Sequence, residues 1–292
     1  MTIAIFGTKI PDSYLVYLQQ LTDHLSQADG HFWIYKPFAD FLDGKIHFPK
    51  PPVPFAKHEE IAGKADLFLS IGGDGTILEA VTIVRGSGIP IAGINMGHLG
   101  FLSGISKEEI LPAIAEMTGK NFHLEQRTLL SLETPTGLFG DLNFALNELA
   151  VHKANVQTLL TIKTYINGQF LNSYWADGLI VATPTGSTAY SLSCNGPILT
   201  PDSENFVITP IASHNLTVRP IVVRDTSRIR ITVESNRNEY LVSLDARVLK
   251  VTGILELNVF KADFTVRLVR FSGTNFFETI REKLKWGLDL RN

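Results

Sequence analysis

Apolar residues in the first third of the chain form short runs that are separated by stretches with helical spacing. Leu15, Leu18, Leu21 and Leu25 recur at the interval of one helical face, and 77–84 has the composition of a second helix. Strands that alternate with helices pair in parallel, so this part of the chain is predicted to be an α/β domain. Four runs have the length and composition of its buried strands: 2–6, 31–35, 67–71 and 90–94.

Caps and chain breakers predict further boundaries. Ser106 and Glu109 have the spacing of a capping box that opens a helix extending to about Thr118, and Asn275 with Glu278 repeats this spacing before a last helix. The apolar residues expected on one face of that last helix are Phe276, Phe277, Ile280 and Leu284. An irregular surface loop is predicted where prolines cluster, at Pro49, Pro51, Pro52 and Pro54.

Beyond about Glu125 the pattern changes to short runs bounded by turn residues. The dipeptide Asn167-Gly168 lies between two such runs and favours a two-residue hairpin turn, because both of its positions need positive φ. Residues 229–233 alternate between apolar and polar side chains, as in a half-buried antiparallel strand. The second half of the chain is therefore predicted to be β-rich.

A glycine-rich loop, Gly72-Gly73-Asp74-Gly75-Thr76, follows the apolar run 67–71. Glycines let peptide N–H groups approach phosphate oxygens, and Thr76 is placed to cap the following helix. The loop contains no lysine, and a carboxylate repels a polyphosphate. We therefore expect Asp74 either to bind a bridging magnesium ion or to face the hydroxyl group that attacks. The loop indicates phosphoryl transfer to an alcohol, although it also fits a glycine-rich turn without function.

A second candidate loop lies in the β-rich half, over Asp177–Ser193. Its apolar strand ends at a proline, Gly186 permits a tight turn, and Ser187 or Thr188 is placed to cap a short helix. Such a loop offers hydroxyl and N–H groups to an adenosine, but its hydroxyls also fit a simple turn cap. Asn147-Glu148 places an amide beside a carboxylate, which suits vicinal ribose hydroxyls as well as a solvated surface.

The composition is that of a globular protein. The chain has 292 residues, which favours two domains, with 45% hydrophobic residues, 19% charged residues and a net charge of -3. This composition argues against a disordered chain and a broad nucleic-acid-binding surface. The single cysteine, Cys194, and an N-terminus without signal-peptide features favour the cytoplasm, and no apolar segment is long enough to span a membrane.

Taken together, these segments closely resemble the NAD kinase family. The shared residues are Gly72-Gly73-Asp74-Gly75-Thr76, Asn95-x-Gly97-x-Leu99-Gly100-Phe101-Leu102, Asn147-Glu148, Asp177–Ser193 and Arg219-Pro220-Ile221-Val222-Val223. The glycine-rich loop alone also fits lipid and sphingoid-base kinases, whereas the run from Asp177 is specific to NAD kinases. The resemblance extends from about Asp66 to Trp286.

The resemblance implies a fold of α/β plus all-β class. A Rossmann-like α/β domain would occupy residues 1–125 and carry the phosphate loop. A β-rich, β-sandwich-like domain over 126–265 would bind NAD, and residues 266–292 would return to the first domain. A homodimer or homotetramer is also implied.

The implied reaction transfers the γ-phosphoryl group of ATP to the 2′-hydroxyl on the adenosine ribose of NAD, with a divalent metal, expected to be Mg²⁺, and gives NADP. Asp74 would accept or orient the hydroxyl proton. Gly72, Gly73, Gly75 and Thr76 would shape the phosphate loop. The residues that would bind NAD are Phe101, Asn147, Glu148, Asp177, Thr185, Thr188, Ala189, Tyr190, Ser193 and Asp245.

The sequence departs from the family pattern in two places. Asp245-Ala246-Arg247 stands where Asp-Gly-Gln is usual, and Asn195 replaces a glycine, which an asparagine tolerates because it adopts left-handed geometry. His214 is expected to be structural. Two alternative functions remain: a kinase of the same superfamily that acts on a lipid or sphingoid base, and a non-catalytic nucleotide-binding sensor.

Overall fold

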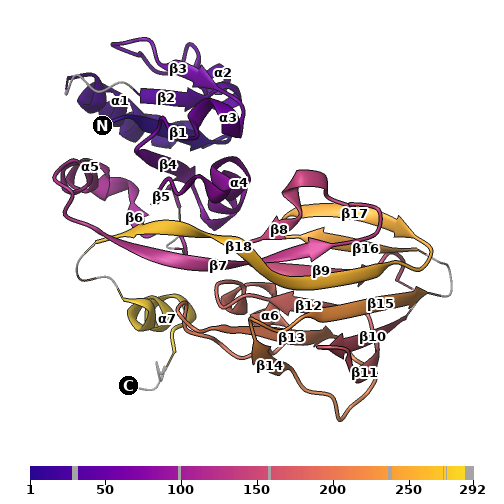
Figure 1. Ribbon diagram of the computed structural model, residues 1–292. Helices are drawn as coiled ribbons and strands as arrows, with labels where there is room; N and C mark the ends of the chain where they lie inside the picture. Colours follow the sequence, from indigo (N-terminus) through magenta and orange to yellow (C-terminus); the bar gives the residue numbers. More distant parts are fainter. Residues whose placement is uncertain are drawn as a thin grey trace. The chain divides into compact units, whose positions relative to one another are not determined.

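The computed structural model describes residues 1–27, 32–97, 100–156, 159–235, 239–271, 273 and 275–286 (Figure 1). The chain forms two compact units. The first contains Met1–Gln126 and Val266–Asn292, and the second contains Arg127–Thr265. The chain passes from the first unit to the second within strand β7 (His123–Glu133), and it returns to the first unit within strand β18 (Glu256–Arg270).

The first unit is built on a parallel sheet with the strand order β3-β2-β1-β4-β5. Ile3 of β1 lies opposite Phe32 on one side and Leu67 on the other, and every residue of β1 and β5 is buried. Such complete burial is expected where helices cover both faces of a parallel sheet. The strands are β1 (Ile3–Gly7), β2 (Phe32–Tyr35), β3 (Val53–Phe55), β4 (Leu67–Gly72), β5 (Ile91–Asn95) and β6 (Ile105–Ser106).

Helices pack on both faces of this sheet. Helices α1 (Leu15–Gln27) and α5 (Ile110–Thr118) share one apolar core with Ala92 and Ile94 of β5. A Cβ added at Gly93, which alternates with those two positions, would instead meet Ile77 of α4 (Asp74–Val84), so α4 covers the opposite face. Other helices of this unit are α2 (Lys36–Leu42), α3 (His58–Ile61) and α7 (Phe276–Leu284), with 3-10 turns at Asp12–Tyr14, Arg85–Ser87 and Lys107–Glu109.

The proline-rich segment contains a strand, so the expectation of a wholly irregular loop is wrong. Strand β3 pairs in parallel with β2, and Pro54 lies opposite Ile34. The sheet order places β3 at the edge. A proline is tolerated there because an edge strand has one side on which no neighbouring strand needs its N–H group.

Both helix caps predicted in this unit are confirmed. Ser106 and Glu109 form a capping box, and Oδ1 of Asn275 accepts a hydrogen bond of 2.8 Å from the N–H group of Glu278. The apolar face of α7 is narrower than expected, since Ile280 is buried but Phe277 is 59% exposed. A helix that rests on a surface buries only one stripe of side chains.

The second unit contains two antiparallel sheets. One has the order β14-β13-β12-β9-β16-β17, and the other contains β11, β10, β15 and the first part of β18. Leu179 and Val181 of β12 share one buried core with Ile231 and Val233 of β15, as in a β-sandwich. The strands are β8 (Phe144–Ala145), β9 (Glu148–Lys153), β10 (Leu160–Ile166), β11 (Gln169–Ala176), β12 (Gly178–Ala182), β13 (Asn205–Ile211), β14 (Ile221–Arg224), β15 (Ile229–Ser235), β16 (Glu239–Leu244) and β17 (Arg247–Thr252).

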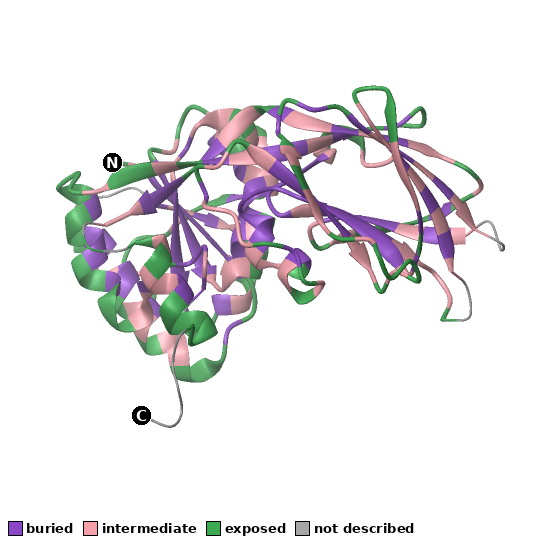
Figure 2. Ribbon diagram, turned by 90° about the horizontal axis from the view of Figure 1, so that it is seen from below, coloured by how far each residue is buried: buried purple, intermediate pink, exposed green. Residues whose placement is uncertain are grey.

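Burial follows these strands closely (Figure 2): buried residues run along the sheets, and exposed residues lie on the outward sides of the helices and on loops. The predicted hairpin turn is confirmed, with φ of 51° at Asn167 and 81° at Gly168. The α/β plus all-β class is also confirmed. Among the described residues, no helix combines the length and apolar character that crossing a membrane requires.

Candidate functional site

The glycine-rich loop leads directly from β4 into α4. Helix α4 begins at Asp74, with Gly73 as its N-cap, so the expectation that Thr76 caps the helix is wrong. Thr76 is buried within the first turn, where a Cβ added at Gly72 would collide with its side chain. Gly72 also has φ of 155°, which disfavours other residues there. The loop therefore sets Asp74 at the positive end of a helix dipole.

Gly73 and Gly75 meet no such obstruction. A Cβ added at either position would touch no heavy atom of the described residues within 4 Å. These glycines leave the outer side of the loop uncovered, as close approach of a ligand to the backbone requires.

The carboxylate of Asp74 is held by the loop that follows β5. Its Oδ1 accepts hydrogen bonds from the N–H groups of Leu102 and Ser103, at 3.1 and 3.0 Å, and from the hydroxyl of Ser103 at 3.0 Å. Its Oδ2 accepts one from the N–H group of Phe101 at 2.8 Å. A carboxylate with this number of donors is strongly stabilised as an anion.

Gly100 makes this arrangement sterically possible. A Cβ at Gly100 would collide with Oδ1 of Asp74 and approach Oγ of Ser103. The backbone of the 100–103 loop can therefore close over the carboxylate only because residue 100 has no side chain.

A lysine from the C-terminal helix completes the surroundings of Asp74. The Nζ atom of Lys283 in α7 lies 3.6 Å from Oδ2 of Asp74 and 4.6 Å from the centre of the Phe101 ring. Burial tends to raise the pKa of Asp74. The N–H group of Ser103, the charge of Lys283 and the N–H groups of Phe101 and Leu102 outweigh burial, so the pKa of Asp74 lies below its usual value.

Arg270, at the end of β18, holds the same loop from its carbonyl side. Its guanidinium donates to the carbonyl oxygens of Leu102 and Phe101, at 2.9 and 3.1 Å, and to Oε2 of Glu125 at 2.8 Å. The peptides that donate to Asp74 are thus fixed by Arg270 as well. Sequence reasoning missed Ser103, Arg270 and Lys283, because their roles come from long-range contacts.

Phe101 lies in the first unit beside α7. Its ring centre is 6.4 Å from that of Phe276, and it is only partly buried. Sequence reasoning left open whether Phe101 fills the core or lines a ligand pocket. Its half-exposed position is compatible with a pocket wall, and that role remains a prediction.

In the second unit, Asn147 and Glu148 are positioned by Asp245. Asp245 occupies the turn between β16 and β17 with φ of 52°, and its carboxylate accepts hydrogen bonds from three consecutive N–H groups. These are the amides of Leu146 at 2.9 Å, Asn147 at 2.8 Å and Glu148 at 3.2 Å. Asp245 therefore acts here on the backbone that carries the Asn147-Glu148 pair.

The side chain of Glu148 lies beside the buried carboxyl group of Asp245. Its Oε2 atom is buried and has no hydrogen-bond partner among the described residues. Burial, followed by the negative charge of Asp245, raises the pKa of Glu148 to about 8. Burial raises the pKa of Asp245 too, but the three amides and Arg247 oppose that rise. With a pKa of about 8, Glu148 holds a proton at neutral pH.

Arg247, which departs from the family pattern, links two segments of the second unit. Its guanidinium donates hydrogen bonds to the carbonyl oxygens of Leu142 and Phe144 and lies over the Phe144 ring at 5.5 Å. It also lies 4.0 Å from Asp245. The arginine thus joins the β16–β17 turn to the segment before Asn147.

The run from Asp177 to Ser193 folds back onto that same segment. The N–H group of Thr183 donates to the carbonyl oxygen of Asn147 at 2.8 Å, and Thr185 accepts a hydrogen bond of 3.2 Å from the buried Arg127. Ser187 is fully buried and bonds to Pro184 and Leu199, so it caps no helix.

The 3-10 turn at Gly186–Thr188 precedes α6 (Tyr190–Ser193), whose N-cap is Ala189. The expectation that Ser187 or Thr188 caps this short helix is therefore wrong. The hydroxyl of Thr188 instead donates to the carbonyl oxygen of Thr185 at 3.2 Å.

Tyr190 presents its ring at the surface of the second unit. It is 37% exposed and stacks on His152 of β9, with 5.4 Å between ring centres and 22° between planes. Asp177 forms an ion pair of 2.6 Å with Lys153, the next residue of β9, and Ser193 is exposed. Sequence reasoning did not identify His152 or Lys153, which the register of β9 brings to this place.

Two further expectations concern the neighbourhood of these elements. Asn195 has φ of 62°, which confirms its left-handed geometry. His214 is exposed, and the centre of its ring lies 4.9 Å from that of Trp175. Its structural role remains a prediction.

The described residues contain no cluster of three or more His, Cys, Asp or Glu side chains that would hold a metal ion. Beside the glycine-rich loop, the carboxylate of Asp74 already accepts four hydrogen bonds. These residues do not form a metal cage by themselves, and a magnesium ion would depend mainly on nucleotide phosphates for its ligands.

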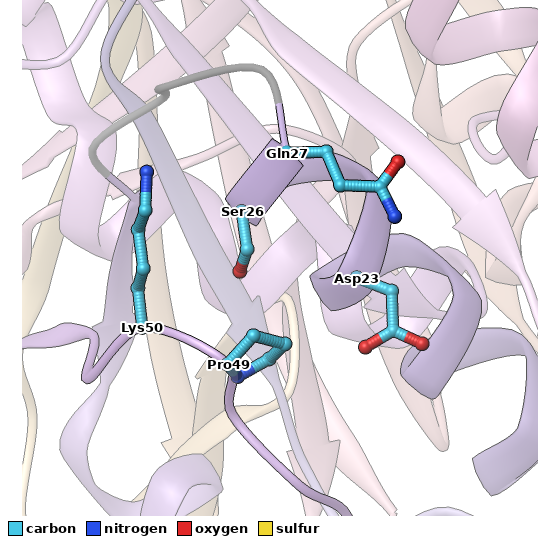
Figure 3. A pocket seen from close by; sticks show the side chains of 5 residues that line it. All are labelled: Asp23, Ser26, Gln27, Pro49 and Lys50. Atoms are coloured by element: carbon cyan, nitrogen blue, oxygen red, sulfur yellow. The ribbon is translucent and has the colours of Figure 1, made fainter.

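A separate small pocket lies in the first unit (Figure 3). It has a volume of about 210 Å³ and is lined by Asp23, Ser26, Gln27, Pro49 and Lys50. None of the residues predicted to form the site lines it.

Comparison with known proteins agrees with these features. The family model described as the ATP-NAD kinase N-terminal domain matches residues 54–120, and that of the ATP-NAD kinase C-terminal domain matches residues 146–271. The chain is 45% identical over 293 residues to the NAD kinase of Cytophaga hutchinsonii and 44% identical over 293 residues to that of Bacteroides fragilis. Each alignment covers 100% of both chains.

Solved structures show the same fold. Yeast NADH kinase complexed with NADH matches with a TM-score of 0.88 and 26% identity, covering 100% of this chain and 89% of that one. An NAD kinase from Archaeoglobus fulgidus in complex with ATP matches in fold, with a TM-score of 0.75 and 24% identity, covering 98% and 99%. The fold and the loop around Asp74 define a nucleotide-dependent phosphotransferase. The chain belongs to the NAD kinase family.

Proposed function

We propose that this chain transfers the γ-phosphoryl group of ATP to the 2′-hydroxyl on the adenosine ribose of NAD and so produces NADP. The observation that carries this proposal is the carboxylate of Asp74, fixed as an anion at the N-terminus of α4 beside an uncovered glycine-rich loop. The two family models and the curated relatives named NAD kinase support the same reaction.

Asp74 is proposed to accept or orient the proton of the 2′-hydroxyl. Its Oδ2 atom carries one hydrogen bond, whereas Oδ1 carries three, so Oδ2 is the oxygen with room for a hydroxyl donor. An ionised aspartate is a weak base. This is sufficient because phosphoryl transfer has a loose transition state and depends mainly on positioning and charge stabilisation.

The phosphate loop is proposed to bind ATP through its backbone. Gly72 and Thr76 shape the loop, and the uncovered Gly73 and Gly75 allow phosphate oxygens to approach the N–H groups at the start of α4. The Archaeoglobus fulgidus relative was solved with ATP. A divalent metal, which we propose to be Mg²⁺, would neutralise phosphate charge and travel with the nucleotide.

The β-rich unit is proposed to bind the dinucleotide. Asn147 and Glu148 would hold the ribose and adenine region, and a protonated Glu148 would donate a hydrogen bond as well as accept one. Asp177 would face the nicotinamide half, and Asp245 would contribute by positioning the 146–148 backbone. The other residues of this unit proposed to line the site are Thr185, Thr188, Ala189, Tyr190 and Ser193, and Phe101 is proposed separately to contact NAD.

We further propose that the protein acts in the cytoplasm as a homodimer or homotetramer, without nucleic-acid or membrane partners. The family relationship favours NAD as the acceptor over a lipid or sphingoid base. A non-catalytic sensor is disfavoured because Asp74 and its donors are all in place.

An end-point assay tests this function. Purified protein is incubated with NAD, ATP and magnesium, and the product is measured with a dehydrogenase that accepts only NADP. We expect NADP to form, and we expect Asp74→Asn to lower turnover by about 10²-fold or more while retaining NAD affinity. Saturable NAD binding without product would instead support a sensor, and neither binding nor turnover would reopen the lipid-kinase alternative.

Asp74→Asn would place an N–H₂ donor opposite the N–H groups that now donate to Asp74, which would destabilise the fold. Thermal unfolding of the variant should therefore be recorded together with the assay to verify that it folds. A folded Asp74→Asn protein with a near-normal rate would refute the role given to Asp74.

A further inference from the structure

Lys283 approaches Asp74 from a distant part of the sequence. Phe276, Ile280 and Lys283 are separated by four and three positions, so they follow one face of α7. Ile280 is buried, and the ring of Phe276 lies beside that of Phe101. The same helix face therefore directs the Lys283 ammonium group over the Phe101 ring and toward the carboxylate.

The contact between Lys283 and Asp74 has the geometry of a loose ion pair. The 3.6 Å separation is longer than a hydrogen bond, and the side chains of Lys283 and Asp74 are 32% and 29% exposed. Partly exposed pairs of this kind contribute about 0–1 kcal/mol to stability. Asp74 already has four other donors, so it does not need Lys283 to satisfy its oxygens.

Lys283 supplies a positive charge that the glycine-rich loop lacks, and a polyphosphate bound at the loop would need such a charge. The glycine-rich loop contains no lysine or arginine between Gly72 and Thr76, and its one charged side chain is negative. Lys283 is the cation that the described residues place within 4 Å of Asp74. An ammonium group is a common phosphate ligand, and its long stem lets it shift from a carboxylate to a nearby phosphate oxygen.

We infer that Lys283 is the cationic phosphate-binding residue of the reaction centre: it pairs with Asp74 when no nucleotide is bound and moves to the transferred phosphoryl group of ATP when the nucleotide binds. This move would leave Oδ2 of Asp74 accessible to the hydroxyl of the acceptor. The inference rests on the proposed function. It adds a residue from the C-terminal helix to a site that sequence motifs placed in loops.

The test compares Lys283→Met, Lys283→Arg and the matched control Arg281→Met. Arg281 is an exposed cation on the same helix and has no ion pair among the described residues, so its removal changes the helix charge equally. Steady-state kinetics gives kcat and the KM values for ATP and NAD. Calorimetry with magnesium and ATP, without NAD, gives the ATP affinity independently of turnover.

We expect Lys283→Met to weaken ATP binding about tenfold and to lower kcat by about 10²-fold, because an electrostatic contact to the transferred group is lost. KM for NAD should stay within about twofold, and the melting temperature should change by no more than about 2 °C. Lys283→Arg should restore most of the ATP affinity. Arg281→Met should match the wild type.

Unchanged ATP affinity and kcat in a folded Lys283→Met protein would overturn the inference, as would equal losses in Lys283→Met and Arg281→Met. If the wild type binds ATP but forms no NADP, the proposed function fails, whereas the calorimetric comparison still decides whether Lys283 binds phosphate.

Discussion

The carboxylate of Asp245 accepts a hydrogen bond of 3.2 Å from the N–H group of Glu148, while the buried Oε2 atom of Glu148 has no partner among the described residues. The two neighbouring carboxyl groups therefore differ in the hydrogen-bond donors that surround them. Asp245 receives three amide donors and lies near Arg247, whereas the described residues offer no donor to Oε2 of Glu148. Together with burial, which raises the pKa of Glu148 to about 8, this inequality favours a proton on Glu148.

The raised pKa of Glu148 predicts a pH dependence of stability. The pKa of Glu148 is about 8 in the folded state, against an ordinary value of 4.5. The contribution of this group to the free energy of unfolding is therefore fully present below pH 4.5. That contribution is lost as the pH rises from 4.5 to 8. We therefore expect Glu148→Gln, which stays neutral, to gain stability relative to the wild type over this interval.

The measurement is thermal unfolding of both proteins between pH 5 and pH 8.5. The melting temperature of Glu148→Gln relative to the wild type should rise by about 2 °C or more across this range. The exposed Glu133→Gln is the control and should show no such trend. A constant difference between Glu148→Gln and wild type at all pH values would contradict the buried, protonated state.

The close contact at Gly100 predicts a sharp loss of turnover in Gly100→Ala. The added methyl group would collide with Oδ1 of Asp74 and displace the carboxylate from the N–H groups of the 101–103 peptides. A shift of about 1 Å in a reacting group costs about 10²-fold in rate. We expect kcat to fall by about that factor in the end-point assay run as a time course.

Gly97→Ala in the same loop is the matched control, since a Cβ at Gly97 would touch no described residue within 4 Å. It should retain the wild-type rate. Equal rates in Gly100→Ala and Gly97→Ala would mean that the carboxylate tolerates displacement and that its fixed position is not required.

The exposed ring of Tyr190 predicts an effect on dinucleotide binding. Tyr190→Ala removes a large aromatic surface that stacks on His152, so KM for NAD should rise about tenfold while KM for ATP stays nearly constant. Tyr190→Phe keeps the ring and should bind NAD almost as the wild type does. If kcat alone fell in Tyr190→Ala, Tyr190 would not belong to the dinucleotide site.

Local sequence patterns predicted much of the fold, because they encode local physics. The Asn167-Gly168 turn and the Asn275 cap depend on backbone sterics and on hydrogen bonds within a few residues, and both are confirmed. The start of α4 was placed too late, because a helix that opens with Asp-Gly lacks the apolar periodicity by which its first turn would be recognised. The prolines likewise prevented the prediction of β3, since a strand tolerates proline only where it lies at the edge of a sheet, and the sequence does not show that position.

The class of fold, the candidate loops and the family can be predicted from the sequence, since periodic burial, turn chemistry and motif spacing are properties of neighbouring residues. The surroundings of the candidate residues, by contrast, depend on the tertiary structure. It brought Lys283 to Asp74, closed the 100–103 loop on that carboxylate through Gly100, and assigned Asp245 to the backbone beside Glu148. Such contacts join positions far apart in the chain, and their geometry depends on how whole helices and sheets pack.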